Sequence, residues 1–318
     1  MSALLLSRRG WAGSGASVPP FLFVGGLLLA ALLVGPRSVP AQSPSLDALE
    51  REIQTVLDSV EGTFAVAFRA LDDTSETLLL NEHSMFHAAS TMKTPVMVEL
   101  YRQAHAGRFD LDDSIRVTNE FRSIVDGSAY SLTPEDDSYE ALYDHLGEKR
   151  PIRTLMREMI TASSNLATNI LIEKVGADRT TQTMRRYGAD RIQVRRGVED
   201  MKAYRQGLNN ETSAHDLLVL LERIARREAV SEEASDEMIA ILKEQAYNDM
   251  IPARLPDSVE VAHKTGWITG LHHDSGIVFV PDGPTYVLVL LSQNLEDEEA
   301  GVDAFARISR VIYDFVTQ

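Results

Sequence analysis

The sequence predicts a two-lobed fold of the α/β-plus-α class. One antiparallel sheet, built from both chain ends, is flanked by helices, and an all-helical lobe is inserted. Short β-like runs occur at residues 63–80 and again at 259–292, while the segment between them has mostly helical spacing of its apolar residues. Helical patterns also precede the first strands and follow the last ones, so the economical arrangement places both terminal segments in one sheet. We expect an α/β lobe over about 42–104 and 246–318, and a helical lobe over about 105–245.

The first 41 residues have the pattern of an export signal. Arg8 and Arg9 supply positive charge, an uncharged apolar run covers residues 21–34, and small or neutral residues precede Gln42. The apolar run has 14 residues, fewer than the roughly 20 that span a bilayer, which favours cleavage over retention as an anchor. We therefore expect a signal peptide at 1–41, export to the periplasm or the medium, and no stable membrane span after cleavage.

Residues 42–318 suit one large domain or two closely packed lobes. The whole chain has 31 Lys and Arg against 47 Asp and Glu, a net charge of −16. Residues 1–41 contain three arginines and no acid, so the remainder has 28 basic and 47 acidic residues and a charge of −19. Such a surface repels phosphate backbones, which argues against nucleic acid as a partner. The chain has no cysteine, so disulfides are excluded.

The N-terminal elements follow from apolar spacing. Residues 46–60 have a helical pattern, and β-like runs at 63–71 and 76–80 surround a polar turn and predict a hairpin. A helix should begin at Ser90 and continue to about residue 103, with Pro95 close to its start, where a missing N–H costs little.

The middle and C-terminal elements follow in the same way. Apolar stripes predict helices around 152–160, 166–175 and 217–224, and the acidic, tyrosine-containing segment 133–150 is interpreted as a surface insertion. Three strands are expected at 259–267, 275–280 and 285–292, with a turn at 281–284 and a final amphipathic helix at 300–316.

Ser90-Thr91-Met92-Lys93 is the first motif with chemical meaning. A hydroxyl and an amine three residues apart at a helix start share one helix face. Serine is a weak nucleophile until a base removes its proton, and a partly desolvated lysine can be that base. The helix start also directs the backbone N–H of Ser90 toward developing negative charge. By itself the motif is weak, because such pairs arise by chance.

Two later motifs contain the remaining parts of an acyl-transfer site. Ser163-Ser164-Asn165 lies between two helical patterns, where Ser163 could relay a proton and the Asn165 amide could bind a substrate carbonyl and a lysine. The alternative is that Ser163 and Asn165 cap the helix starting at Leu166. Lys264-Thr265-Gly266 lies on a strand, where Lys264 and Thr265 could hold a carboxylate and Gly266 permits close approach. The alternative is a solvated lysine at a strand end.

The three motifs follow one another in this order, separated by 73 and 101 residues. In this combination the chain resembles the serine β-lactamases and penicillin-binding proteins, most closely the class A β-lactamases, over nearly all of its length after residue 41. The resemblance implies the two-lobed β-lactamase/transpeptidase-like fold. It also implies roles for the motif residues: acylation at Ser90, deprotonation by Lys93, proton relay to the leaving nitrogen by Ser163, amide binding by Asn165, carboxylate binding by Lys264 and Thr265, and an oxyanion hole formed by the backbone N–H groups of Ser90 and Trp267.

The chain departs from the class A pattern at the glutamate that activates the water for hydrolysis of the acyl-enzyme. The expected segment is Glu-x-x-Leu-Asn, but the available pair is Leu208-Asn209, with Arg205 in the glutamate position. The nearest acids are Glu199 and Asp200. Glu199 could replace the missing glutamate, or the two acids could be a solvated pair.

Other departures lie within and beside the motifs. Ser164 replaces the usual aspartate, and Trp267 stands where a small residue is common, so it should crowd or line the substrate cleft. His272 and His273 are adjacent on an expected strand and should point to opposite faces, so no metal site is expected there. His87 is expected to pack or cap rather than act as a second base.

The leading hypothesis is an exported serine hydrolase that opens β-lactam rings through an acyl-enzyme on Ser90. A second is a slowly deacylating penicillin-binding peptidase, or an esterase or amidase on another small substrate. A third is a non-catalytic module that binds β-lactams or peptidoglycan fragments; it is less favoured because no transmembrane segment follows residue 41. The expected partner is a small molecule, with no cofactor, and the chain is expected to be a monomer.

Overall fold

The computed structural model describes residues 10, 12–13, 15–17, 19–20 and 45–318. The signal peptide expected at 1–41 therefore lies largely outside the described residues. Within them, no helix combines the length and the apolar composition that crossing a membrane requires.

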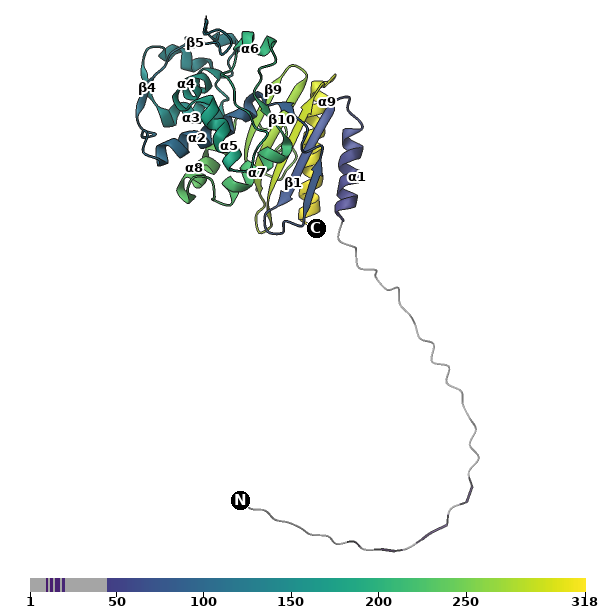
Figure 1. Ribbon diagram of the computed structural model, residues 1–318. Coiled ribbons are helices and arrows are strands. Elements are labelled where there is room, and N and C mark those ends of the chain that lie inside the picture. Colours follow the sequence, from purple (N-terminus) through teal and green to yellow (C-terminus); the bar gives the residue numbers. More distant parts are fainter. Residues whose placement is uncertain (1–9, 11, 14, 18, 21–44) are drawn as a thin grey trace, which may run out of the picture. The chain divides into compact units, whose positions relative to one another are not determined.

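A five-stranded antiparallel sheet is built from strands near both ends of segment 45–318 (Figure 1). Its order is β2-β1-β11-β10-β9, from β1 (Thr63–Ala70), β2 (Thr77–Leu80), β9 (Glu260–Ile268), β10 (Leu271–Phe279) and β11 (Thr285–Gln293). β1 pairs along its whole length with β11, with Ala67 opposite Val289. The prediction that both ends build one sheet is confirmed.

The sheet is covered on both faces, which explains why its central strands are almost continuously apolar. Along β1, Ala65 and Ala67 face the core shared with the helical part, while Val66 and Phe68 face the terminal helices. These terminal helices are α1 (Leu46–Leu57) and α9 (Glu298–Val316), which pack against each other. On the opposite face, α7 (Ala214–Ala225) contacts β1, β10 and β11.

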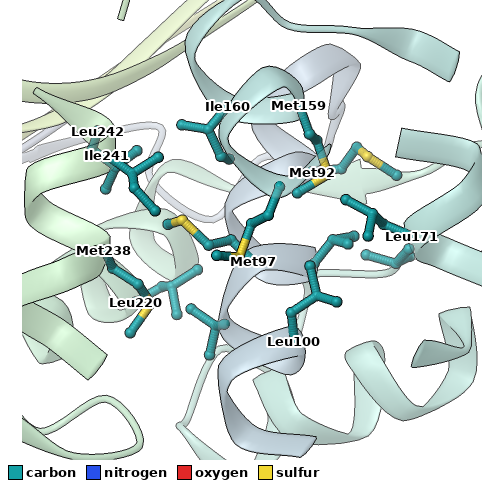
Figure 2. Packing of buried hydrophobic residues seen from close by; sticks show 14 of the residues in the cluster. Met92, Met97, Leu100, Met159, Ile160, Leu171, Leu220, Met238, Ile241 and Leu242 are labelled. Carbon is teal, nitrogen blue, oxygen red and sulfur yellow. The ribbon is translucent and has the colours of Figure 1, made fainter. Parts of the chain in front are cut away.

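The helical part is built around α2 (Lys93–His105), which is buried on nearly all sides. Figure 2 shows Met92 and Met97 among the side chains of neighbouring helices, including Met159 and Leu171. The surrounding helices are α3 (Ile152–Thr161), α4 (Asn165–Val175), α5 (Ala177–Arg186) and α8 (Glu232–Leu242). The shorter elements are β3 (Phe86–His87), η1 (Ala89–Met92), β4 (Ser114–Arg116), β5 (Phe121–Arg122), β6 (Ala129–Tyr130), η2 (Pro134–Asp136), η3 (Glu140–His145), β7 (Lys149–Pro151), α6 (Met201–Arg205) and β8 (Glu211–Thr212).

Two predictions about local structure were wrong. The α-helix does not begin at Ser90: the backbone N–H and the hydroxyl of Thr91 both donate to Ala88 O, which makes η1 a 3₁₀ turn, and α2 begins at Lys93. The strand expected at 275–280 begins at Leu271, because the polar residues ahead of Ser275 pair with β9 and β11.

Segment 133–150 is more than a surface insertion. Leu142 is fully buried in the core, and Asp137 is buried against the start of α4. The polar composition was misleading, because buried carboxylates are tolerated where backbone N–H groups satisfy them.

Candidate active site

Ser90 lies on η1, on the wall of a cavity of about 340 Å³. The turn that carries it is held by His87, whose Nδ1 accepts a hydrogen bond from Ala89 N at 3.1 Å. Ala89 has a φ of +44°, a conformation that non-glycine residues rarely adopt. Such local strain persists where the surroundings over-determine it, often at functional sites.

Lys93 is fully buried one turn beyond Ser90. Its Nζ donates to Ser163 O at 2.7 Å, to Ser163 Oγ at 3.0 Å and to Asn165 Oδ1 at 3.0 Å. Burial first, and then the nearby Lys264, hold the pKa of Lys93 well below its ordinary value, while Asp137 opposes them. A neutral amine, the form able to accept a proton from serine, is therefore accessible.

Among residues 45–318, no hydrogen bond joins Ser90 Oγ to Lys93 Nζ. Catalytic hydrogen bonds commonly shorten only when substrate is bound, so this arrangement is compatible with proton transfer between the two groups.

Ser163 lies between two lysines. Its Oγ accepts from Lys93 and also from Lys264, whose Nζ is 3.1 Å away. Burial lowers the pKa of Lys264 to about 7, with Asp274 acting in the opposite direction. The three motifs found in the sequence are thus joined by one buried hydrogen-bond chain, although they are 73 and 101 residues apart.

The start of α4 is held by two polar side chains that the sequence did not identify. Ser164 is the N-cap, since its Oγ accepts from Ala167 N, so the alternative that Ser163 and Asn165 cap this helix is wrong. Asp137 accepts from Asn165 N at 2.9 Å and from Leu166 N at 2.8 Å. No local pattern indicated Asp137, because its partners lie 28 and 29 residues away.

β9 packs against η1 at Gly266. A Cβ built on Gly266 would lie 2.9 Å from Ser90 N, closer than real Cβ contacts, and 3.1 Å from Thr91 N, closer than most of them. Thr265 is buried beside Gly266, whereas Trp267 is 60% exposed and lines the cavity. The glycine at this position therefore lets the strand lie against the backbone of the nucleophile turn.

Replacing Gly266 with alanine should displace this turn. We expect the rate of acylation by a chromogenic cephalosporin to fall by about tenfold or more, since an error of about 1 Å in positioning costs up to about a hundredfold. Stopped-flow acylation rates and the melting temperature would check it. An acylation rate equal to wild type would contradict the close contact.

Glu199 is the candidate base for deacylation, and Arg205 stands where the class A pattern has its glutamate. The two residues lie in different surroundings. Glu199 lines the cavity with Ser90, while Arg205 is exposed at the end of α6 and is not among the lining residues. Desolvation first and then Asp136 raise the pKa of Glu199, and Arg196 opposes them. Position 205, where the Glu-x-x-Leu-Asn pattern would have its glutamate, therefore lies outside the cavity lining.

The loop that carries Glu199 is closed by polar contacts at its base. Asn210 Oδ1 accepts from the backbone N–H groups of Arg195 and Arg196, and Asn210 Nδ2 donates to Arg196 O. The Arg196 guanidinium donates to Leu208 O and to Asn209 Oδ1. Leu208 and Asn209 therefore hold the loop closed.

The two adjacent histidines of β10 point to opposite faces. His272 Nε2 lies 3.1 Å from Glu298 Oε2, near α9, while His273 is buried with its Nε2 2.9 Å from His87 O. Within the described part of the chain, no three His, Asp or Glu side chains are grouped as metal ligands. His87 does cap, as expected, and it also lines the cavity.

Comparison with known proteins gives consistent matches over this region. A model described as the β-lactamase enzyme family matches residues 48–316. A β-lactamase of Bacteroides uniformis is 24% identical over 292 residues, covering 86% of this chain and 93% of the relative. The extended-spectrum β-lactamase PER-1 of Pseudomonas aeruginosa is 25% identical over 285 residues, covering 86% of this chain and 88% of the relative.

Solved structures match equally well. A β-lactamase from Sphaerobacter thermophilus has a TM-score of 0.71 at 24% identity, covering 85% of this chain and 97% of that one. PBP-A has a TM-score of 0.72 at 26% identity, covering 85% and 96%. These structures share the two-lobed fold predicted from the sequence.

Proposed function

This chain belongs to the β-lactamase enzyme family, and on that premise we propose that it is an exported serine hydrolase of the class A type, which opens β-lactam rings through an acyl-enzyme on Ser90. The observation that supports the proposal most is the buried hydrogen-bond chain Lys93–Ser163–Lys264 beside Ser90.

Acylation begins when Ser90 Oγ attacks the β-lactam carbonyl carbon and Lys93 Nζ accepts its proton. The depressed pKa of Lys93 supports this step, because the amine must be neutral to act as a base. The carbonyl oxygen becomes an oxyanion held by the backbone N–H groups of Ser90 and Trp267. Ser163 Oγ passes a proton to the ring nitrogen as the C–N bond breaks, and Lys93 replaces that proton through its 3.0 Å hydrogen bond.

Substrate binding is assigned to groups on both sides of Ser90. The Asn165 amide binds the amide of the acyl arm, and Lys264 with Thr265 binds the ring carboxylate. Gly266 lets the substrate and β9 approach the nucleophile turn, and Trp267 lines the entrance.

Deacylation is assigned to Glu199, which takes a proton from the water that attacks the ester carbon. Its place on the cavity wall supports this role, and its raised pKa makes the carboxylate a stronger base. The ester C–O bond then breaks, and the proton is returned to Ser90 Oγ.

A slowly deacylating penicillin-binding peptidase is the alternative, favoured by the fold match to PBP-A, a mutant of which was solved as an acyl-enzyme complex with penicillin G. Export, the division into lobes at about 105 and 245, and a monomeric state remain proposals that rest on the sequence.

Intact-protein mass spectrometry with benzylpenicillin tests the proposal and separates the alternatives. We expect a penicilloyl adduct that disappears within seconds of substrate exhaustion and that peptide mapping of the quenched protein locates to the peptide containing Ser90. An adduct that lasts for hours indicates the peptidase. Absence of any adduct, together with absence of hydrolysis, contradicts acylation by β-lactams altogether.

A further inference from the structure

One wall of the cavity takes no part in the acyl-transfer chemistry described above. It is formed by His87 at the end of β3, Arg196 and Asn210 at the base of the Glu199 loop, and Tyr204 on α6. Tyr204 is close to both His87 and Arg196. Its ring centroid is 6.2 Å from that of His87, in an edge-on arrangement, and 6.0 Å from the guanidinium carbon of Arg196. Two hydrogen-bond donors are therefore gathered around one aromatic ring.

His87, which lines the cavity, has a buried ring N–H without a hydrogen-bond partner among the described residues. Its Nδ1 accepts from Ala89 N, so in the neutral ring the proton is on Nε2. Desolvation first, and the charge of Arg196 second, lower the pKa of His87 to about 4, so the ring is neutral at pH 7. The Nε2 atom is buried and has no hydrogen-bond partner among the described residues. Leaving a buried donor without a partner is unfavourable, and a bound acceptor would remove this cost.

Arg196 is a buried cation without a carboxylate partner on the same wall. It is only 6% exposed, yet among residues 45–318 no acid forms a salt bridge with it. Its three hydrogen bonds go to neutral oxygens, of Gly197, Leu208 and Asn209. A guanidinium has five N–H groups, so two remain for a ligand. Buried arginines are normally paired with an anion.

Asp200 and Glu199 are close enough to act on Arg196 through their charge, but among the described residues neither forms a salt bridge with it. Asp200, which acts on Arg196 through its charge, accepts hydrogen bonds from Ser123 Oγ, Ile124 N and Ala203 N. Glu199 has Asp136 as its strongest charged neighbour and Arg196 as the next, and it is not among the oxygens that accept hydrogen bonds from the Arg196 side chain. The wall of His87 and Arg196 therefore offers donors and positive charge.

We propose that His87 Nε2–H and the Arg196 guanidinium bind a carboxylate carried on the acyl arm of the β-lactam substrate. This carboxylate is additional to the one on the ring, which is assigned to Lys264 and Thr265 on β9. The inference rests on the proposed function, and it predicts a preference for β-lactams with an anionic acyl arm over those with a neutral one.

Two penicillins that differ only in this group provide the test. Benzylpenicillin has a benzyl arm, and carbenicillin has the same arm with an added carboxylate. We expect wild type to have the higher kcat/KM for carbenicillin. In His87→Asn, the amide oxygen can still accept from Ala89 N but the Nε2–H is lost, so the carbenicillin-to-benzylpenicillin ratio of kcat/KM should fall by about tenfold.

Two further variants control for folding and for histidine loss in general. His87→Gln places an N–H near the original Nε2 and should keep most of the wild-type ratio. His83→Asn alters a histidine that is exposed and is not among the cavity-lining residues, so the ratio should equal that of wild type. A wild-type preference for benzylpenicillin, or equal ratios in wild type and His87→Asn, would overturn the proposal.

Binding to Ser90→Gly distinguishes failure of this inference from failure of the proposed function. Calorimetric titration with each penicillin should give tighter binding of carbenicillin, by about tenfold. Equal affinities for the two penicillins would contradict the proposed carboxylate site but not the proposed function. If neither penicillin binds and wild type is not acylated, both proposals are wrong.

Discussion

Ser90→Ala should lower the rate at which a chromogenic cephalosporin is opened to the rate seen in buffer, a loss of about 10⁴-fold or more. The reason is that the variant keeps the cavity, Lys93 and the Ser163 relay but has no oxygen to form the ester. The rate of cephalosporin ring opening, followed by absorbance with wild type and variant at equal concentration, measures it.

Ser114→Ala is a suitable control, because this exposed serine lies on β4 and is not among the residues lining the cavity. It should retain the wild-type rate. If wild type and Ser90→Ala open the ring at the same residual rate, Ser90 is not the nucleophile and the acyl-enzyme mechanism is wrong.

Glu199→Gln should slow hydrolysis of the acyl-enzyme, so that the protein stays acylated after it has reacted with a β-lactam. Glutamine has nearly the same shape but cannot accept the proton of the attacking water, and loss of a general base typically costs about 10²–10⁴-fold. We expect acylation within threefold of wild type, but a penicilloyl adduct that persists for minutes to hours. Stopped-flow bursts and mass spectrometry over time would separate the two steps.

Arg205→Gln is the matched control, since Arg205 occupies the position at which the motif pattern places a glutamate. Its adduct should decay at the wild-type rate, because its side chain is exposed and is not among those lining the cavity. If Glu199→Gln deacylates as fast as wild type, Glu199 is not the base and another group must activate the water.

The sheet and the main helices could be predicted from local patterns, because burial imposes a period on the sequence. β1, β2 and β11 were located to within a residue or two, and α9 to within two residues at its start. The 3₁₀ turn at Ser90 was missed, since η1 and the α-helix that follows it share nearly the same apolar spacing.

Side chains whose partners are far away in the sequence could not be found in this way. Asp137 satisfies the start of α4 from a segment that reads as polar surface. His87 and Arg196 lie 109 residues apart, and neither belongs to a recognisable motif. Their meeting on one cavity wall depends on how β3 and the Glu199 loop pack.

By itself, the sequence determined the family resemblance, the two-ended sheet and the three motifs, because each motif needs only a few neighbouring residues on a helix start, a turn or a strand. The tertiary structure alone decided that Glu199, together with Asp136, lines the cavity with Ser90. A loop has no period that reveals its path. Contacts with distant residues, such as those of Asn210 and Arg196 at its base and of Asn169 with Val198, hold Glu199 on the cavity wall and leave Arg205 outside.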